Sequence, residues 1–486
     1  MNKIISLLMS LAAIVILTAC PKVQDVEDIP YEEAKTFIHE ELKYLYYWND
    51  EIPDKVDYRN PVEIENFYNS LLVTKDHWSW MQEGKEYISD EMGVSYGTFG
   101  ASLSQAIKYH NDYDVKVRYV IPNSPFDKAG VTRGWTITHI DGQSKDDLVN
   151  SGKITTIFNN SNPSDVHEFV FLDTEGKQQV RNIQSAAVLN MRPALIATIF
   201  DGSSYQGLDE RVGYFNYLGF KAGNDAFGKP MIDDIKENMQ MFKSAGIKKL
   251  ILDLRYNGGG DSRASDTLVN YLAPKSAIGK TYVTRTHNQD LSKENESFQI
   301  KRIIDKSGND LSLDLDALYI ITGPGSASAS EMVLNGLMPL MKVEQVGDTT
   351  YGKPNGMYVV YYPASKQDYE QYNHNNFAGL EYVFLPIAFY NKNGLGENIP
   401  DDGIKPGLGA RPDDIYHDFG PQEDNISACL YHIINGKYPQ LPQPSRFMFT
   451  KSNSSRNANL EPENRDKHYG KFYDVENHFI INNLDN

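Results

Sequence analysis

Two short apolar runs constrain the fold of this chain more than any other feature, because hydrophobic residues follow one another in them instead of alternating with polar ones. They are residues 249–254 and residues 317–322. Strands of this kind are buried on both faces, as in parallel sheets whose crossover connections are helices. Residues 231–242, just before the first run, have the apolar period typical of an amphipathic helix. Residues 188–441 therefore predict an α/β domain with mainly parallel strands.

Three further regions have different patterns. Residues 30–84 carry apolar side chains at spacings of three and four, which predicts a small helical N-terminal domain. Residues 85–187 contain short strand-like segments and turns, including Asp141-Gly142, a pair typical of hairpin turns. Residues 442–486 are rich in Asn, Ser and charge, so we expect a polar C-terminal tail that is at least partly loosely held.

The N-terminus has the pattern of a targeting segment. Lys3 is its only charge, and the apolar run that follows is too short for a comfortable membrane-spanning helix. The run ends in Leu17-Thr18-Ala19-Cys20, which resembles a bacterial lipobox, where the cysteine receives diacylglycerol and becomes the new N-terminus. The resemblance implies a lipoprotein signal peptide over residues 1–19, lipidation at Cys20 and a tether over residues 20–29. The alternative is a plain secretory signal that ends in an incidental cysteine.

The lipobox also predicts a location, and the composition narrows the partners. A lipid anchor places the protein in the bacterial cell envelope, on the periplasmic or surface face of the outer membrane. The 486 residues contain 47 Lys+Arg and 65 Asp+Glu, and the net charge of −18 argues against binding to nucleic acid. Cys20 and Cys429 are the only cysteines, which excludes a disulfide scaffold and a cysteine-built zinc site. With Cys20 lipidated, Cys429 is expected to be a small core residue.

A loop of small residues follows the second apolar run and leads into a helical pattern. Residues 323–331 read Gly-Pro-Gly-Ser-Ala-Ser-Ala-Ser-Glu. A strand, a short loop and a helix N-terminus would place hydroxyls beside unpaired backbone N–H groups, which favour the negative charge of an acyl-transfer oxyanion. The serines could instead only cap the helix, because Ser328 and Glu331 have the spacing of a capping box.

Two other motifs carry candidate groups. Lys353 lies in a predicted turn, 25 residues after Ser328. Taken alone, a lysine is usually solvated. Residues 253–260 read Asp-Leu-Arg-Tyr-Asn-Gly-Gly-Gly and end the first apolar run, and their three glycines would let bare backbone amides approach a ligand. The alternative is a plain strand-to-helix turn.

Together, the three motifs resemble those of the C-terminal processing (tail-specific) serine peptidases. The resemblance covers residues 30–407 and implies a crotonase-like (ClpP/crotonase) α/β core with a PDZ domain and a helical N-terminal domain. It implies a serine endopeptidase in which Ser328 is the nucleophile and Lys353 the general base. Only a neutral lysine can accept a proton, so Lys353 is expected to be partly buried, with its pKa lowered by desolvation.

The same resemblance implies an oxyanion hole and makes a cofactor unnecessary. The oxyanion would be bound by the Ala329 amide and by one amide from Gly258 or Gly259. No metal or other cofactor is required, and the histidines show no HExxH or comparable ligand spacing.

Part of the region at 85–187 resembles the PDZ domain of bacterial proteases. The matching residues are 125–131, Gly134 and 137–142. PDZ domains bind an extended peptide C-terminus by adding a strand to a sheet edge, so the resemblance implies protein substrates with exposed C-termini. It places the binding loop near Gly93 and Val94. A PDZ-shaped module with a blocked groove is the alternative.

The chain departs from the family pattern at two positions. Some members have an Asp eleven residues after the nucleophile, where this chain has Pro339, and others a Gln four residues after the lysine, where it has Met357. A third, orienting residue is therefore unassigned. The alternative function is a catalytically degenerate lipoprotein that binds peptide tails as a scaffold. Ser328 and Lys353 favour the peptidase, and the missing third residue favours the scaffold.

Overall fold

The computed structural model describes residues 31–95, 97–104, 107–109, 112–160, 162–163, 165–362, 380–440 and 471–474. The predicted signal peptide, lipidation site and tether lie outside these residues. No helix in the described ranges is long and apolar enough to cross a bilayer.

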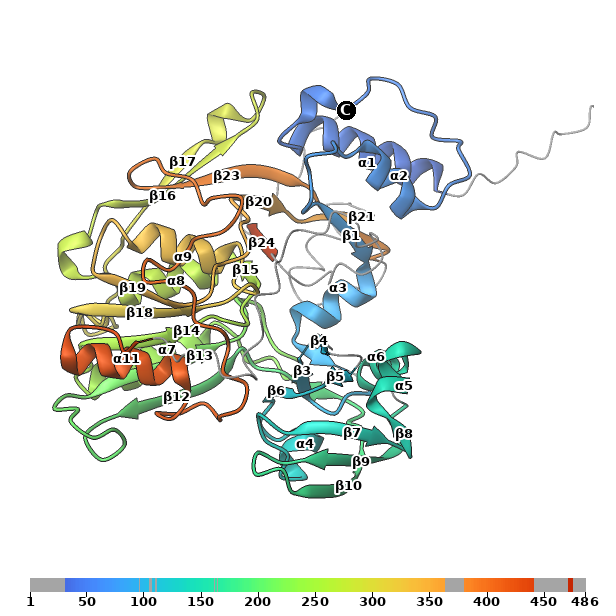
Figure 1. The fold of residues 1–486 in the computed structure, drawn as a ribbon. Helices are drawn as coiled ribbons and strands as arrows, with labels where there is room; N and C mark the ends of the chain where they lie inside the picture. The colour runs from blue at the N-terminus through green and yellow to red at the C-terminus, as the bar shows by residue number, and fades with distance from the viewer. Residues whose placement is uncertain are drawn as a thin grey trace, which may run out of the picture.

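The centre of the molecule is a five-stranded sheet in the order β12-β13-β14-β18-β19 (Figure 1). Its strands are β12 (Ala194–Phe200), β13 (Val212–Tyr217), β14 (Lys249–Asp253), β18 (Ala317–Thr322) and β19 (Val343–Gly347). Only β12 pairs antiparallel with its neighbour. Every residue of β13 and β18 is buried, as expected for strands covered on both faces. The predicted α/β architecture is confirmed, and the strands of this central sheet are mainly parallel.

Helices cover both faces of this sheet. They are α7 (Asp233–Ser244), α8 (Ser262–Leu272), α9 (Ala329–Leu337) and α11 (Asp424–Asn435). Two short 3-10 turns, η2 (Lys275–Ala277) and η3 (Ser292–Glu294), lie in the chain between α8 and α9. Leu250 and Leu252 of β14 pack in one apolar cluster with Phe242 of α7. Ile251, which points the other way, packs in a second cluster with Cys429 of α11. Cys429 is therefore the buried core residue that was predicted, and burial raises the pKa of its thiol.

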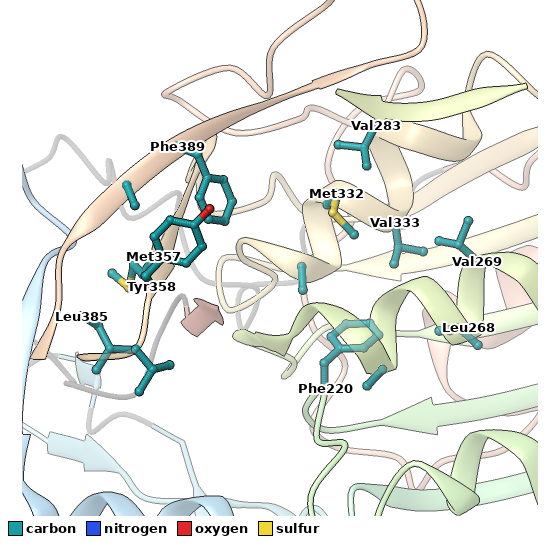
Figure 2. Packing of buried hydrophobic residues seen from close by; sticks show 14 of the residues in the cluster. Phe220, Leu268, Val269, Val283, Met332, Val333, Met357, Tyr358, Leu385 and Phe389 are labelled. Carbon is teal, nitrogen blue, oxygen red and sulfur yellow. The ribbon is translucent and has the colours of Figure 1, made fainter. Parts of the chain in front are cut away.

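A second sheet of six strands packs over α8 and α9 in the order β15-β24-β20-β23-β16-β17. Its strands are β15 (Gly259–Asp261), β24 (Lys471–Asp474), β20 (Asn355–Tyr358), β23 (Ile387–Asn393), β16 (Thr281–His287) and β17 (Glu296–Gln299). Figure 2 shows the apolar contact, in which Val283 of β16 lies near Met332 and Val333 of α9.

Strand β24 differs from the sequence-based prediction, because it comes from the segment expected to be a polar tail separate from the α/β domain. It pairs in parallel with β15 on one side and with β20 on the other. Phe472 and Tyr473 supply the aromatic residues that favour strands, and the open edges of β15 and β20 supply partners. Four residues of the tail therefore belong to a sheet of the α/β domain.

The N-terminal segment contains α1 (Glu32–Leu45), η1 (Asn49–Glu51) and α2 (Ile64–Leu71). It is not a separate unit, since β1 (Trp80–Glu83) pairs with β22 (Tyr382–Leu385), which also pairs with β21 (Val360–Tyr362). Asp76 stabilises the turn before β1 by accepting hydrogen bonds from the Trp78 and Ser79 amides and the Tyr46 hydroxyl. The helices, β1 and the α/β domain share one apolar cluster.

Residues 98–186 form a β-rich unit with its own core around Phe99, Phe126 and Phe169. Its elements are β3 (Ala101–Leu103), β4 (Ile107–Tyr109), β5 (Asp112–Asp114), β6 (Val117–Val120), α4 (Pro125–Lys128), β7 (Thr136–Ile140), β8 (Gln143–Ser144), α5 (Lys145–Asn150), α6 (Lys153–Asn160), β9 (Val166–Leu172) and β10 (Gln178–Gln184). Asp141 and Gly142 both have positive φ, 51° and 74°, which confirms the predicted hairpin turn.

The β-rich unit is joined to the rest of the molecule by α3 (Gly84–Glu91) and by a short pair of strands. In that pair, β2 (Val94–Ser95) runs antiparallel to β11 (Leu189–Asn190). The segment that enters the unit and the segment that leaves it are thus bonded to each other at its base.

Candidate active site

The three serines of the small-residue loop have different hydrogen bonds. Ser326 Oγ donates to the Leu254 carbonyl at 2.7 Å, and Ser330 Oγ donates to the Asn257 carbonyl at 2.8 Å. These two serines therefore fasten the loop to the end of β14. Ser328 is 2% exposed. Ser328 and Glu331 have the arrangement of a capping box, but the Ser328 Oγ forms no hydrogen bond of good geometry with any described residue. Because buried hydroxyls are normally paired, the middle serine is the exception that needs an explanation.

The backbone of Ser328 is strained. Its φ of 57° and ψ of −109° lie where non-glycine residues are rarely found, at a cost on the order of 1–3 kcal/mol. Ser328 directly precedes α9, whose first backbone N–H groups have no partner within the helix. The hydroxyl is thus held at the positive end of a helix dipole, in a conformation that the surrounding contacts must maintain.

Glu331 holds together the serine loop, which is the small-residue loop before and at the start of α9, and the lysine loop, which connects β19 to β20 and contains Lys353. Its Oε2 accepts hydrogen bonds from the backbone amides of Ser328, at 2.8 Å, and Lys353, at 2.9 Å. The two nitrogens therefore lie less than about 6 Å apart. Its Oε1 accepts from Thr350 Oγ1 and from the Gly352 amide, at 2.6 and 2.7 Å. Burial raises the pKa of Glu331, although these four hydrogen bonds favour the ionised carboxylate and oppose the shift.

Lys353 is buried, with only 1% of its surface exposed. Its Nζ donates to the sulfur of Met357 at 3.6 Å, and Met357 itself is fully buried. Met357, which stands at the sequence position noted above for departing from the resembled pattern, thus lies beside the lysine amine, although a thioether is only a weak acceptor. Pro339 lies beyond the far end of α9, and that end is already about 14 Å along the helix axis from Ser328.

The glycines after β14 differ in the hydrogen bonds of their amides. The Gly259 N–H donates to Asn257 Oδ1 at 2.9 Å, so it is not available to an oxyanion in this conformation. No hydrogen bond of the Gly258 N–H falls within the described ranges. Ala329 is the first residue of α9, so its N–H has no partner within the helix. Of the two glycine amides that the sequence left open, the structure favours Gly258.

Asn257 connects the glycine loop, which is the segment between β14 and β15, to the serine loop. It was not singled out from the sequence. Its side chain donates to the Tyr217 carbonyl at 2.9 Å as well as accepting from Gly259. Its own carbonyl accepts from the Ala327 amide and from Ser330 Oγ. The glycine loop and the serine loop are therefore bonded through one asparagine.

A cavity of about 280 Å³ lies between the glycine loop and the β-rich unit. Its walls include Gly258–Gly260 from the α/β domain and Thr98, Gly100 and Tyr119 from the β-rich unit. Thr98 and Gly100 were not predicted from the sequence, although two glycines around Phe99 just before a strand are a local sign of a loop that approaches a ligand closely.

Gly93 and Val94, the residues predicted to form a peptide-binding loop, have a structural role instead. Gly93 borders the cavity, but its carbonyl accepts from the Met191 amide at 2.7 Å. A Cβ on Gly93 would lie 2.6 Å from the Met191 oxygen. Val94 belongs to β2, which is paired with β11. These residues therefore close the base of the β-rich unit, whereas Thr98, Gly100 and the β3 residues Ala101 and Ser102 line the cavity.

A buried charge network connects the β-rich unit to the glycine loop. Arg133 is 2% exposed and donates to the Tyr256 hydroxyl at 2.6 Å and to Asp413 Oδ1 at 2.8 Å. Arg255 donates to the same Asp413 oxygen at 2.9 Å. Burial alone would raise the pKa of Asp413, but the two guanidinium groups outweigh it and lower this pKa to about 2. Tyr256 lies two residues before Gly258, so the network reaches the candidate oxyanion hole.

Comparison with known proteins gives two matching family models. One, Peptidase family S41, matches residues 211–406, and the other, Peptidase S41 N-terminal domain, matches residues 33–80. A probable CtpA-like serine protease of Staphylococcus aureus (strain COL) is 24% identical over 325 residues, which are 62% of this chain and 58% of that protein. A chloroplastic C-terminal processing peptidase of Tetradesmus obliquus is 22% identical over 288 residues, 58% of this chain and 57% of that protein.

This chain thus spans somewhat more than half the length of the curated relatives that it matches. Among solved structures, a putative S41 protease from Bacteroides fragilis NCTC 9343 superposes with a TM-score of 0.64 at 21% identity. The match covers 82% of this chain and 96% of that one. At this identity the likeness establishes the fold.

Proposed function

Because this chain belongs to peptidase family S41, we propose that it is a serine endopeptidase with Ser328 as nucleophile and Lys353 as general base. One observation carries the assignment. Of the three serines in the loop, Ser328 alone has a hydroxyl without a described partner, and Glu331 binds its amide together with that of Lys353.

The proposed reaction follows from these positions. Neutral Lys353 takes the hydroxyl proton while Ser328 Oγ attacks a peptide carbonyl carbon, and the carbonyl oxygen becomes an oxyanion. The amides of Ala329 and Gly258 bind that oxyanion at the N-terminus of α9. Lys353 then gives the proton to the leaving amine, the C–N bond breaks, and an acyl-enzyme remains. Water hydrolyses this ester by the same route.

We also propose that the β-rich unit is a PDZ domain that binds the C-terminus of the substrate. Support comes from its PDZ-like motif at residues 125–142, from its separate core and from the cavity that it shares with the glycine loop. The Arg133 network supports a connection from this unit to the candidate oxyanion hole, because Arg133 and Tyr256 share the Asp413 carboxylate.

Recognition of a free C-terminus can be tested with two forms of one unstructured reporter protein, one with a C-terminal carboxylate and one with a C-terminal amide. We expect kcat/KM to be roughly tenfold to a hundredfold lower for the amide, because hydrogen bonds to a charged carboxylate are lost. Acetylation of the reporter's N-terminus is the matched control and should change nothing. Equal cleavage of the carboxylate and the amide would contradict tail recognition and leave the peptidase assignment standing.

For the location, we propose a lipid anchor on Cys20 in the bacterial cell envelope, supported by the lipobox-like sequence before it. Replacing Cys20 with Ser removes the thiol that receives the lipid. We expect the Cys20→Ser protein to keep the mass of the unprocessed precursor and to lose the lipid mass of the wild-type mature protein, as intact-mass spectrometry would show. Cys429→Ser is the control. A wild-type protein without lipid mass would contradict the anchor.

A further inference from the structure

Strand β24 lies between the two strands that lead away from the proposed catalytic groups (Figure 1). On one side, Lys471 is opposite Gly259 in β15, which begins one residue after Gly258. On the other side, Tyr473 is opposite Met357 in β20, which begins two residues after Lys353. A short segment near the C-terminus thus connects the strand of the glycine loop to the strand of the lysine loop.

The space that β24 fills is one extended chain wide. Neighbouring strands lie about 4.8 Å apart, so β15 and β20 stand about 10 Å from each other with β24 between them. Gly260 of β15 is bridged on its other side by Phe220, and a Cβ on Gly260 would lie 2.1 Å from the Phe220 oxygen. That side of β15 is therefore closed, and the side facing β20 is where a further strand fits.

This position is next to Ser328. The carbonyl of Asn257, two residues before β15, accepts hydrogen bonds from the amide of Ala327 and from Ser330 Oγ, which flank Ser328 along the loop. A main chain that pairs with β15 therefore passes the corner where Gly258 and the serine loop meet.

We propose that the gap between β15 and β20 is the seat for the extended main chain of the substrate, and that residues 471–474 of this chain occupy it as a competitor in cis. The inference rests on the proposed peptidase function. Strand addition uses backbone hydrogen bonds, so the same seat accepts main chains of different sequence. Without an occupant, β15 and β20 would present unpaired N–H and C=O groups to each other.

The connection of β24 to the rest of the chain is long enough for this strand to leave the gap and for a substrate to take its place. Residues 441–470 lie between the last described loop and β24, and that length can span on the order of 100 Å. The strand can therefore leave its seat while α11 stays in place. With an effective concentration of about 1 mM for a segment tethered in cis, a tail with a Kd of about 100 µM would lower kcat/KM about tenfold.

The test compares two proline variants of the full chain. Tyr473→Pro removes a backbone N–H inside β24, whereas Asn482→Pro places the same residue beyond the strand. With the unstructured reporter as substrate, we expect Tyr473→Pro to raise kcat/KM about tenfold, mainly through a lower KM. Asn482→Pro should match wild type. Equal KM values for all three proteins would overturn the inference.

A second measurement covers the case in which the proline disturbs folding. A chain that ends at residue 470 should show the same increase in kcat/KM. A synthetic peptide of residues 467–478 should inhibit this shortened chain competitively at about 0.1–1 mM. A scrambled peptide of equal composition is the control and should not inhibit. Failure of the native-sequence peptide to inhibit would contradict the seat.

The same peptide separates this inference from the proposed function. With a fluorescent label, it should bind Tyr473→Pro more tightly than wild type, by fluorescence anisotropy, whether or not any form cleaves the reporter. Binding without cleavage in any form would support the seat and refute the peptidase. Cleavage at equal rates without peptide binding would refute the seat and support the peptidase.

Discussion

Replacing Ser328 with alanine should lower kcat/KM for an unstructured protein substrate by roughly four to six orders of magnitude, because the attacking oxygen is removed. The fold should be unaffected. Ser328 Oγ has no hydrogen-bond partner among the described residues, and alanine tolerates the positive φ about as well as serine does. The measurements are steady-state cleavage of the reporter and the free energy of unfolding in denaturant.

The two flanking serines provide matched controls, because we expect their replacement to lower stability and to leave activity largely unchanged. Ser326→Ala and Ser330→Ala each remove one of the two hydrogen-bond donors to a buried carbonyl, that of Leu254 or Asn257. We expect each to lower the free energy of unfolding by about 1–3 kcal/mol while keeping activity within about tenfold of wild type. Loss of activity in a control but not in Ser328→Ala would reject the assignment of the nucleophile. A wild-type protein without turnover would favour the scaffold function.

Replacing Lys353 with methionine is the second change with a large expected effect. Methionine keeps an unbranched apolar chain in the buried site but has no amine to accept the serine proton, so we expect kcat to fall about 10³- to 10⁵-fold. The measurements are kcat and KM for steady-state cleavage of the reporter.

Two further variants define what the lysine contributes. Lys353→Arg keeps a cation that is not deprotonated in proteins, so we expect it to be as inactive as Lys353→Met. Met357→Gln gives Nζ an amide oxygen in place of the sulfur that it now contacts, and we expect it to keep activity within about tenfold of wild type. Full activity in Lys353→Met would rule out the Ser–Lys dyad and direct the search for a base to Glu331.

The features that could be predicted from the sequence depend on short stretches of chain. The apolar runs at β14 and β18 identify buried strands from their own composition, and residues 323–331 and Lys353 match a linear motif with the right spacing. Ser328 could be proposed for the same reason. What distinguishes Ser328 from its neighbours depends on distant contacts, because Ser326 and Ser330 are bonded to carbonyls more than seventy residues away.

The features that were missed depend on residues far apart in the sequence. Glu331 could be recognised as a helix cap, but its bonds to Gly352 and Lys353 exist only after β19 has returned the chain to α9. Arg133 and Asp413 are 280 residues apart and have no local sign of their partnership. Strand β24 is four residues of an otherwise polar segment, and its pairing depends on edges that β15 and β20 offer.

The pairing of β1 with β22 has a consequence for the order of events during synthesis. Trp80 is opposite Leu385, so this sheet cannot form until most of the chain has left the ribosome. Contacts of such long sequence separation also slow folding. The lysine loop leads into β20, which pairs with β23, and both strands are made late as well. The strands next to the proposed base therefore reach their final pairing only when synthesis is nearly complete, whatever the early part of the chain has folded into by then.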